Sequence, residues 1–200
     1  MSAAAPAKTN NRASQGARYG SEAAGARSSA RVVEGPDAIR SAVREHERRG
    51  VDVIKVMASG GMTTVGTDPF GVQFDAADLW TLVDAAHAVG LPVVAHAHSL
   101  AGIRHALAAG VDGIEHFTGL AETGIRVPDE VLEAVAAAGV FVNPTLGFDR
   151  EALASMPAPP QGMTAAMKRI GLDFDTAQTA RLQVLQRAQT HGIELVTGVD

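Results

Sequence analysis

The sequence of 200 residues contains no cysteine, few aromatic residues (4%) and no excess of basic residues. Without cysteine, a disulfide framework, a zinc finger and a thiol nucleophile are all excluded. The formal net charge of -5 argues against nucleic acid, whose binding proteins usually carry a basic patch. No apolar run approaches the roughly 18 to 20 residues of a membrane helix. These absences favour a cytoplasmic enzyme that acts on a small molecule, with neither a nucleic-acid nor a membrane partner.

Two regions of different composition follow each other along the chain. Residues 1–34 are rich in Ala, Ser, Gly and Arg, and hold almost no large apolar side chain before Val32. Such a segment buries too little surface to order itself, so we predict disorder. An organellar transit peptide has a similar composition, but no amphipathic face is evident here. Residues 35–200 are expected to form the folded domain.

From residue 35 onward, one unit recurs five times: a helical segment, a glycine, and then a short buried strand. The glycines are Gly50, Gly90, Gly110, Gly139 and Gly192. This alternation predicts a parallel sheet with right-handed crossovers, and we expect a partial (β/α)8 barrel. A doubly wound sheet stays an alternative, although no G-x-G-x-x-G motif follows a strand. Residues 147–175, which include Pro157, Pro159 and Pro160, are expected to form an extended loop or lid.

Two histidines follow the central strands at the same spacing. His96 lies six residues after Gly90, and His116 lies six residues after Gly110. The carboxyl ends of parallel strands meet at one edge of the sheet, where α/β proteins place their chemistry. Neutral imidazoles suit zinc and related divalent metals. We therefore expect His96 and His116 to bind a metal ion, although a lone histidine is more often a hydrogen-bonded core residue.

Lys55 stands at the corresponding position of the first strand, between Ile54 and Val56. Burying a lone ammonium there would cost several kcal/mol. Lys55 could therefore pair with a carboxylate or reach the rim of the barrel. Alternatively, a lowered pKa would let the neutral amine capture CO2 as a carbamate and bridge two metals.

Four further residues are candidates for the site. His98 could share the orientation of His96, and we expect it to contact substrate or to support the metal ligands. Asp200 could bind a metal and take a proton from metal-held water, although chain ends fray. Gly60 and Gly61 could form an anion-binding nest, a turn, or a contact to a substrate carboxylate.

Several segments of the sequence resemble those of a known family. The segments IKVMASGGMTT, AHAH, GIRHALAAGVDGIEH, VNPTL and TGVD are similar to those of the metal-dependent amidohydrolase superfamily. The branch that they most resemble contains the prolidase-like and imidazolonepropionase-related hydrolases with a carboxylated lysine.

The resemblance implies strands four to eight of a (β/α)8 barrel. It also implies a carboxylated Lys55 that bridges two divalent metals, with zinc the expected metal. His96 and His116 would hold one metal, and Asp200 would bind the other and shuttle the proton. The implied reaction is hydrolysis of an amide or peptide bond, for example in dipeptides or N-acyl amino acids.

The sequence departs from the family pattern in several respects. The H-x-H pair of the family's first strand is absent, and so are the first three strands. The alternative to an active hydrolase is therefore a remnant without activity of its own, which pairs with a missing barrel half or forms a homo-oligomer.

Overall fold

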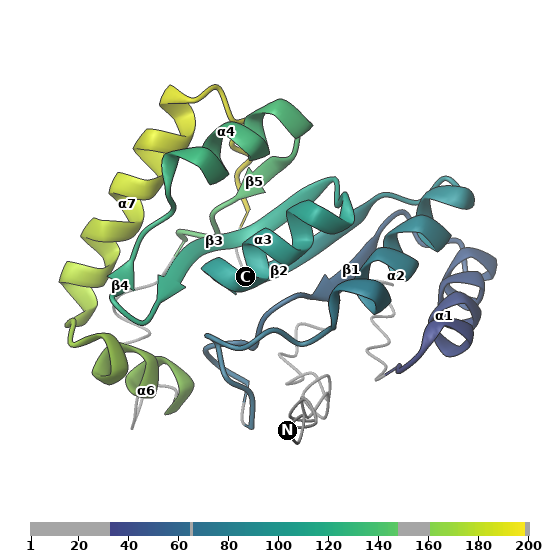
Figure 1. The fold of residues 1–200 in the computed structure, drawn as a ribbon, viewed down its shortest axis with the longest axis horizontal. Helices are drawn as coiled ribbons and strands as arrows, with labels where there is room; N and C mark the ends of the chain where they lie inside the picture. Colours follow the sequence, from purple (N-terminus) through teal and green to yellow (C-terminus); the bar gives the residue numbers. More distant parts are fainter. Residues whose placement is uncertain (1–32, 65, 148–160, 199–200) are drawn as a thin grey trace, which may run out of the picture.

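A computed structural model describes residues 33–64, 66–147 and 161–198 of the chain (Figure 1). Its helices are α1 (Pro36–Arg48), α2 (Ala76–Ala88), α3 (Leu100–Ala109), α4 (Asp129–Ala138), α6 (Gln161–Ile170) and α7 (Phe174–Thr190). Its strands are β1 (Ile54–Met57), β2 (Val93–Ser99), β3 (Gly113–Ala121), β4 (Gly124–Ile125) and β5 (Phe141–Asn143). Among these described helices, none has the length and apolar character needed to cross a membrane.

The strands form one sheet in which β1, β2, β3 and β5 run parallel in that order. The short β4 returns from the end of β3 and pairs with it antiparallel. These pairings confirm the predicted parallel α/β architecture, and the four parallel strands follow one another in sequence order. The expected final strand is reduced, within the described residues, to a single parallel bridge between Leu195 and Val142.

Local signals in the sequence explain where the helices begin and end. The carboxylates of Asp75 and Asp173 and the hydroxyl of Ser99 accept hydrogen bonds from backbone N–H groups at the starts of α2, α7 and α3. At the other ends, the glycines that follow the helices have left-handed backbones, with φ between 68° and 82° at Gly50, Gly90, Gly110, Gly139 and Gly192.

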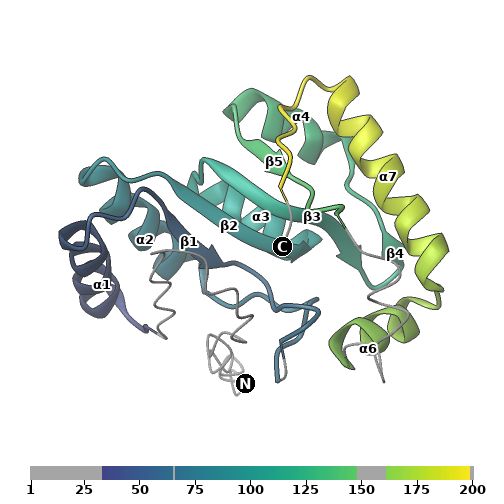
Figure 2. The same ribbon diagram turned by 180° about the vertical axis from the view of Figure 1, so that it is seen from behind.

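The two faces of the sheet differ in character. On one face α3 packs against β2 and β3, and buried apolar side chains such as Val56, Ala95 and Ile114 are at most 3% exposed. Figure 2 shows the strands in front of α3, from the opposite side. The strand register places Lys55 of β1 and Glu115 of β3 together on the other face of the sheet, away from α3. The Lys55 side chain is 46% exposed on this face. This second face corresponds to the interior of a barrel.

Two expectations from the sequence need correction. The central strands are longer than predicted, so His96 and His98 lie within β2 and His116 lies within β3 rather than after them. In addition, α6 occupies residues 161–170, where a loop was expected. All the prolines of this region precede residue 161, and Ala, Met and Lys then favour a helix. The predictions of an N-terminal disordered segment and of a lid cannot be compared with the structure over their whole length, because residues 1–32 and 148–160 lie outside the described residues.

Candidate metal centre

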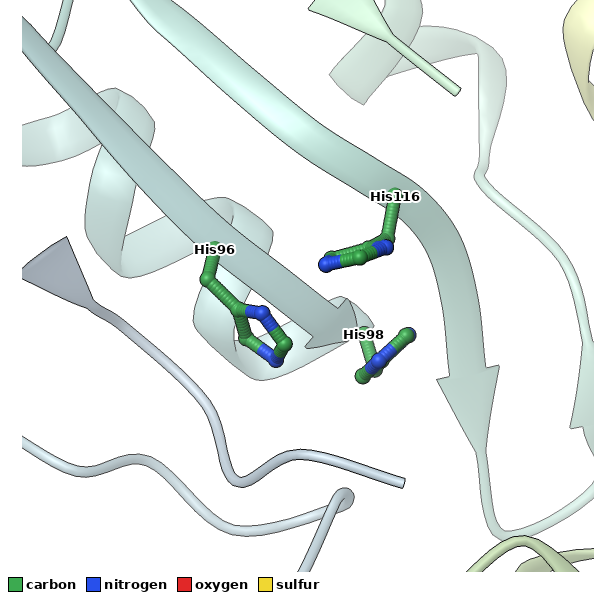
Figure 3. A group of neighbouring side chains, drawn as sticks. All are labelled: His96, His98 and His116. Carbon is green, nitrogen blue, oxygen red and sulfur yellow. The ribbon is translucent and has the colours of Figure 1, made fainter. Parts of the chain in front are cut away.

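Three histidine side chains meet near the carboxyl end of the sheet (Figure 3). The ring centroid of His116 lies 4.4 Å from those of both His96 and His98, and the centroids of His96 and His98 are 4.7 Å apart. All three residues are buried, with at most 7% of their surface exposed. One nitrogen from each ring can be chosen so that the three atoms lie within 4.8 Å of one another. The His96 and His116 side chains therefore lie close together, and His98 joins them; their role as metal ligands stays a prediction.

An irregularity of β3 brings His116 into this cluster. Along β2 and β3, His96 is paired with Glu115 and Ala97 with His116. Simple alternation would therefore send the His116 side chain to the same face as buried Ala97. Instead, His116 and Phe117 have positive φ angles, 68° and 45°, and the register then shifts. Such a bulge redirects a side chain, and here it turns the imidazole toward His96.

Each ring is held by a hydrogen bond to a neighbouring element. The Nε2 of His96 donates to the carbonyl oxygen of Gly60 at 3.3 Å, because a carbonyl can only accept. The Nδ1 of His98 is hydrogen-bonded to Thr118 Oγ1 at 2.9 Å, and the Nδ1 of His116 to Thr145 Oγ1 at 2.7 Å. These partners fix the ring orientations, as they do for metal-binding histidines in general.

The surroundings of the cluster keep two of its histidines neutral. Burial lowers the pKa of His98 well below its ordinary value, and the nearby His116 and His96 lower it further. Burial also lowers the pKa of His116 to about 2, with further contributions from His96, Lys55 and Arg181. Both imidazoles therefore keep a lone pair at neutral pH. A neutral ring is the form that binds a metal ion.

These residues fit a divalent metal. Nitrogens bound to one zinc ion at about 2.0–2.1 Å lie at most about 4.2 Å apart. The limit of 4.8 Å among the three histidine nitrogens is therefore within small side-chain adjustments of a shared ligand sphere. Three buried nitrogen donors without a cysteine suit zinc and related first-row metals.

Lys55 lies at a half-exposed position of β1. Its side chain is 46% exposed and forms an ion pair with Glu115. The pair spans from β1 to β3 across the sheet face that no described helix covers. Lys55 nevertheless contributes to the electrostatic environment of His116, so it lies near the cluster. The arrangement matches the carboxylate pairing considered above; a bridging role for Lys55 stays a prediction.

The glycines after β1 do not form an anion-binding nest. The N–H of Gly60 donates to Gly71 O at 3.3 Å, and the N–H of Gly61 donates to Thr67 Oγ1 at 3.1 Å. Because both amides are used within the loop, neither is open to an anion. Gly60 instead contributes its carbonyl to His96. Asp200, which was predicted to bind the second metal, lies outside the described residues.

Sequence reasoning missed one polar residue of the cluster and assigned no role to another. Thr118 follows His116 by two positions, but its contact with His98 depends on the bulge in β3. Thr145 lies six residues after Gly139, the same spacing that His96 and His116 have from their glycines. This spacing could have indicated that Thr145 lies beside the histidines. Thr118 and Thr145 are at most 6% exposed, so their hydroxyl groups bond to the buried histidines rather than to solvent.

A parallel sheet with helices outside and a histidine cluster at its carboxyl edge defines part of a (β/α)8-type barrel. Comparison with known proteins agrees. The model of the amidohydrolase family matches residues 4–170, and the chain belongs to this family.

Several hydrolases are similar to this chain. Ochratoxinase from Aspergillus niger is 31% identical over 169 residues, 84% of this chain and 32% of the ochratoxinase. Its crystal structure gives a TM-score of 0.67 at 29% identity, over 84% of this chain and 35% of that one. The structure of a prolidase complexed with N-methylphosphonate-L-proline gives a TM-score of 0.70 at 28% identity, and the match covers 86% of this chain and 39% of the prolidase. The structure of a Xaa-Pro dipeptidase with bound methionine gives a TM-score of 0.66 at 26% identity, and the match covers 84% of this chain and 39% of the dipeptidase. The chain thus spans about a third of the length of these relatives.

Proposed function

We propose that this chain carries the metal-binding portion of a hydrolase active site that cleaves amide C–N bonds in small molecules such as dipeptides or N-acyl amino acids. The observation that carries the proposal is the buried cluster of His96, His98 and His116, whose nitrogens lie within 4.8 Å of one another. The similar proteins include a prolidase and a Xaa-Pro dipeptidase, and they support this substrate class.

In this proposal, His96 and His116 hold a divalent metal, with zinc expected. When bound, that ion would polarise a substrate carbonyl and lower the pKa of a coordinated water. Gly60 and Thr145 hold the two imidazoles in their ligating orientations through the hydrogen bonds at 3.3 Å and 2.7 Å. Asp200 is proposed to bind a second metal and to accept the proton of the attacking water.

His98 is proposed to contact the substrate. Its low pKa keeps the ring neutral, and Thr118 fixes its Nδ1. In the tautomer whose Nδ1 accepts from the Thr118 hydroxyl, the Nε2–H can donate to the oxygen of a substrate carbonyl. As that oxygen gains negative charge during attack, the hydrogen bond strengthens, which is the general basis of oxyanion stabilisation.

Lys55 is proposed to become a carbamate. Its neutral amine would attack CO2, forming a nitrogen–carbon bond and releasing a proton, and the resulting anion could bridge two metals. The ion pair with Glu115 must open for this reaction. An intact mass measured under native conditions would exceed that of the unmodified chain by one CO2, and Lys55→Met would abolish the difference.

Zinc titration by calorimetry tests the proposal. The chain is expected to bind Zn²⁺ with about one equivalent or more, and His96→Ala and His116→Ala are each expected to abolish binding at one site. His98→Ala should keep zinc but lose hydrolysis of dipeptides. As a control, His46→Ala removes a histidine of α1 whose ring is hydrogen-bonded to the carbonyl of Ala42 in the same helix, and it should change neither property. Zinc binding that survives the two ligand variants would overturn the proposal.

A second function is favoured by the coverage of the relatives. Because the chain spans about a third of their length and Lys55 is half exposed, it could bind metal yet need further barrel strands for turnover. Zinc binding without hydrolysis of any dipeptide or N-acyl amino acid would favour this alternative. Recovery of hydrolysis after a polypeptide with the missing strands is added would establish it.

A further inference from the structure

A small apolar cavity lies beside the histidine cluster. Its volume is about 30 Å³, room for a water molecule or two. The methionines Met62, Met163 and Met167 line it together with Ile125 and Phe174. Methionine side chains are flexible and polarizable, so a wall made of them can rearrange around an apolar group.

One charged side chain, Arg181 on α7, lines the same cavity. Arg181 is only 8% exposed, and burial lowers its pKa to about 10, which still leaves it charged at neutral pH. Its Nη1 donates to Gln178 Oε1 at 3.1 Å and its Nη2 to Pro144 O at 2.8 Å, whereas its Nε–H donates to no protein atom. Within residues 33–64, 66–147 and 161–198, no carboxylate forms an ion pair with it. A buried cation without an anion is costly, so an anionic ligand would be the missing partner.

The cavity is connected to the proposed reaction centre through one residue. Thr118 lines the cavity, and its hydroxyl is hydrogen-bonded to His98 at 2.9 Å. Arg181 is also close enough for its charge to lower the pKa values of His98 and His116. A ligand group in the cavity would thus lie next to the imidazoles.

We propose that Arg181 and the methionine-lined cavity form the subsite for one half of the substrate, namely an apolar side chain that carries a free carboxylate. The guanidinium binds the carboxylate, and the methionines open around the side chain. This inference rests on the proposed function, and it selects N-acyl amino acids and dipeptides with an apolar residue over neutral amides. Arg181 is in this view a specificity-determining residue.

The test compares two ligands of nearly equal shape on the zinc-loaded full chain. N-acetyl-L-leucine has a carboxylate, and N-acetyl-L-leucinamide replaces it with a neutral amide. Calorimetric or NMR titration should give the carboxylate ligand an affinity at least about tenfold higher, as a hydrogen bond between two charged groups provides. Equal affinities, or no binding of either ligand, would overturn the subsite without the need for any variant.

Variants show whether Arg181 causes the higher affinity for the carboxylate ligand. Arg181→Met should remove this preference, and Arg181→Lys should keep part of it. The matched control Arg187→Met changes a half-exposed arginine of the same helix, which pairs with Asp129, and should keep the whole preference for the carboxylate ligand. Zinc affinity measured in the same samples separates the two hypotheses. If zinc binds normally but the carboxylate is not preferred, only the subsite fails; if zinc does not bind, the proposed function fails.

Discussion

The hydrogen bond between Thr145 and His116 provides a sharp test of how the metal centre is organised. Thr145 is 6% exposed, and its Oγ1 lies 2.7 Å from Nδ1 of His116. Thr145→Val keeps the branched shape and removes the hydroxyl, so His116 loses this partner in a buried place. We expect the free energy of unfolding to fall by about 1–3 kcal/mol. Because the ring is then less well oriented, zinc affinity should fall by roughly 10- to 100-fold.

Two further variants show whether the effect belongs to the hydroxyl and to His116. Thr145→Ser keeps the hydroxyl and removes one methyl, so it should cost about 0.8 kcal/mol of stability and leave zinc affinity close to that of the wild type. Thr118→Val removes the matching hydroxyl at His98; it should destabilise the fold similarly but leave zinc binding nearly unchanged, since His98 is proposed to contact substrate. Urea unfolding and zinc calorimetry measure both quantities. Equal losses of zinc affinity in Thr145→Val and Thr118→Val would refute this assignment of roles.

Three other predictions concern backbone and charge. Gly113→Ala places a Cβ 2.2 Å from the Phe141 ring and should destabilise the fold by about 1–3 kcal/mol; adding Phe141→Leu should recover part of the loss in urea unfolding. Gly60→Ala meets backbone atoms of the facing loop at 2.2 Å, so it should lower both the melting temperature and zinc affinity, because it displaces the carbonyl that holds a histidine. Hydrogen bonds from Thr176 lower the pKa of Asp173 from 3.8. Its contribution to stability should therefore be present above pH 3.8 and be lost as the pH falls through the lower folded-state pKa, and Asp173→Asn should flatten this acid dependence of the unfolding free energy.

Much of the fold could be predicted because its signals are local. A glycine that ends a helix and an apolar run that follows it lie within a few residues, and both Gly90 and Gly110 have the left-handed backbone that ends many helices. The equal spacing of His96 and His116 from these glycines then predicted that the two side chains meet. Parallel strands carry residues at similar positions to the same edge of the sheet. The turn of the His116 side chain toward His96, however, depends on the bulge in β3.

Other features depend on contacts between distant segments. The position of Arg181 beside the histidines follows from how α7 packs, and nothing in its own neighbourhood of the sequence indicates it. The exposure of Lys55 likewise depends on which strands cover its face of the sheet. The flanking Ile54 and Val56 predicted a buried strand correctly, because they point to the helices. Lys55 points the other way, and the pattern of one strand cannot tell whether that second face is covered.

The bulge at His116 is the feature that strand periodicity cannot foresee, and it can be tested by itself. His116 has a φ of 68°, a left-handed conformation that asparagine tolerates better than alanine does. His116→Asn and His116→Ala should both lose zinc. However, the asparagine variant should be more stable by about 1 kcal/mol, because alanine bears the full penalty of the left-handed backbone. Unfolding of both variants in urea without metal measures this difference. Equal stabilities would mean that the left-handed turn at residue 116 does not hold the ring in place, and the convergence of His116 with His96 and His98 would then need another cause.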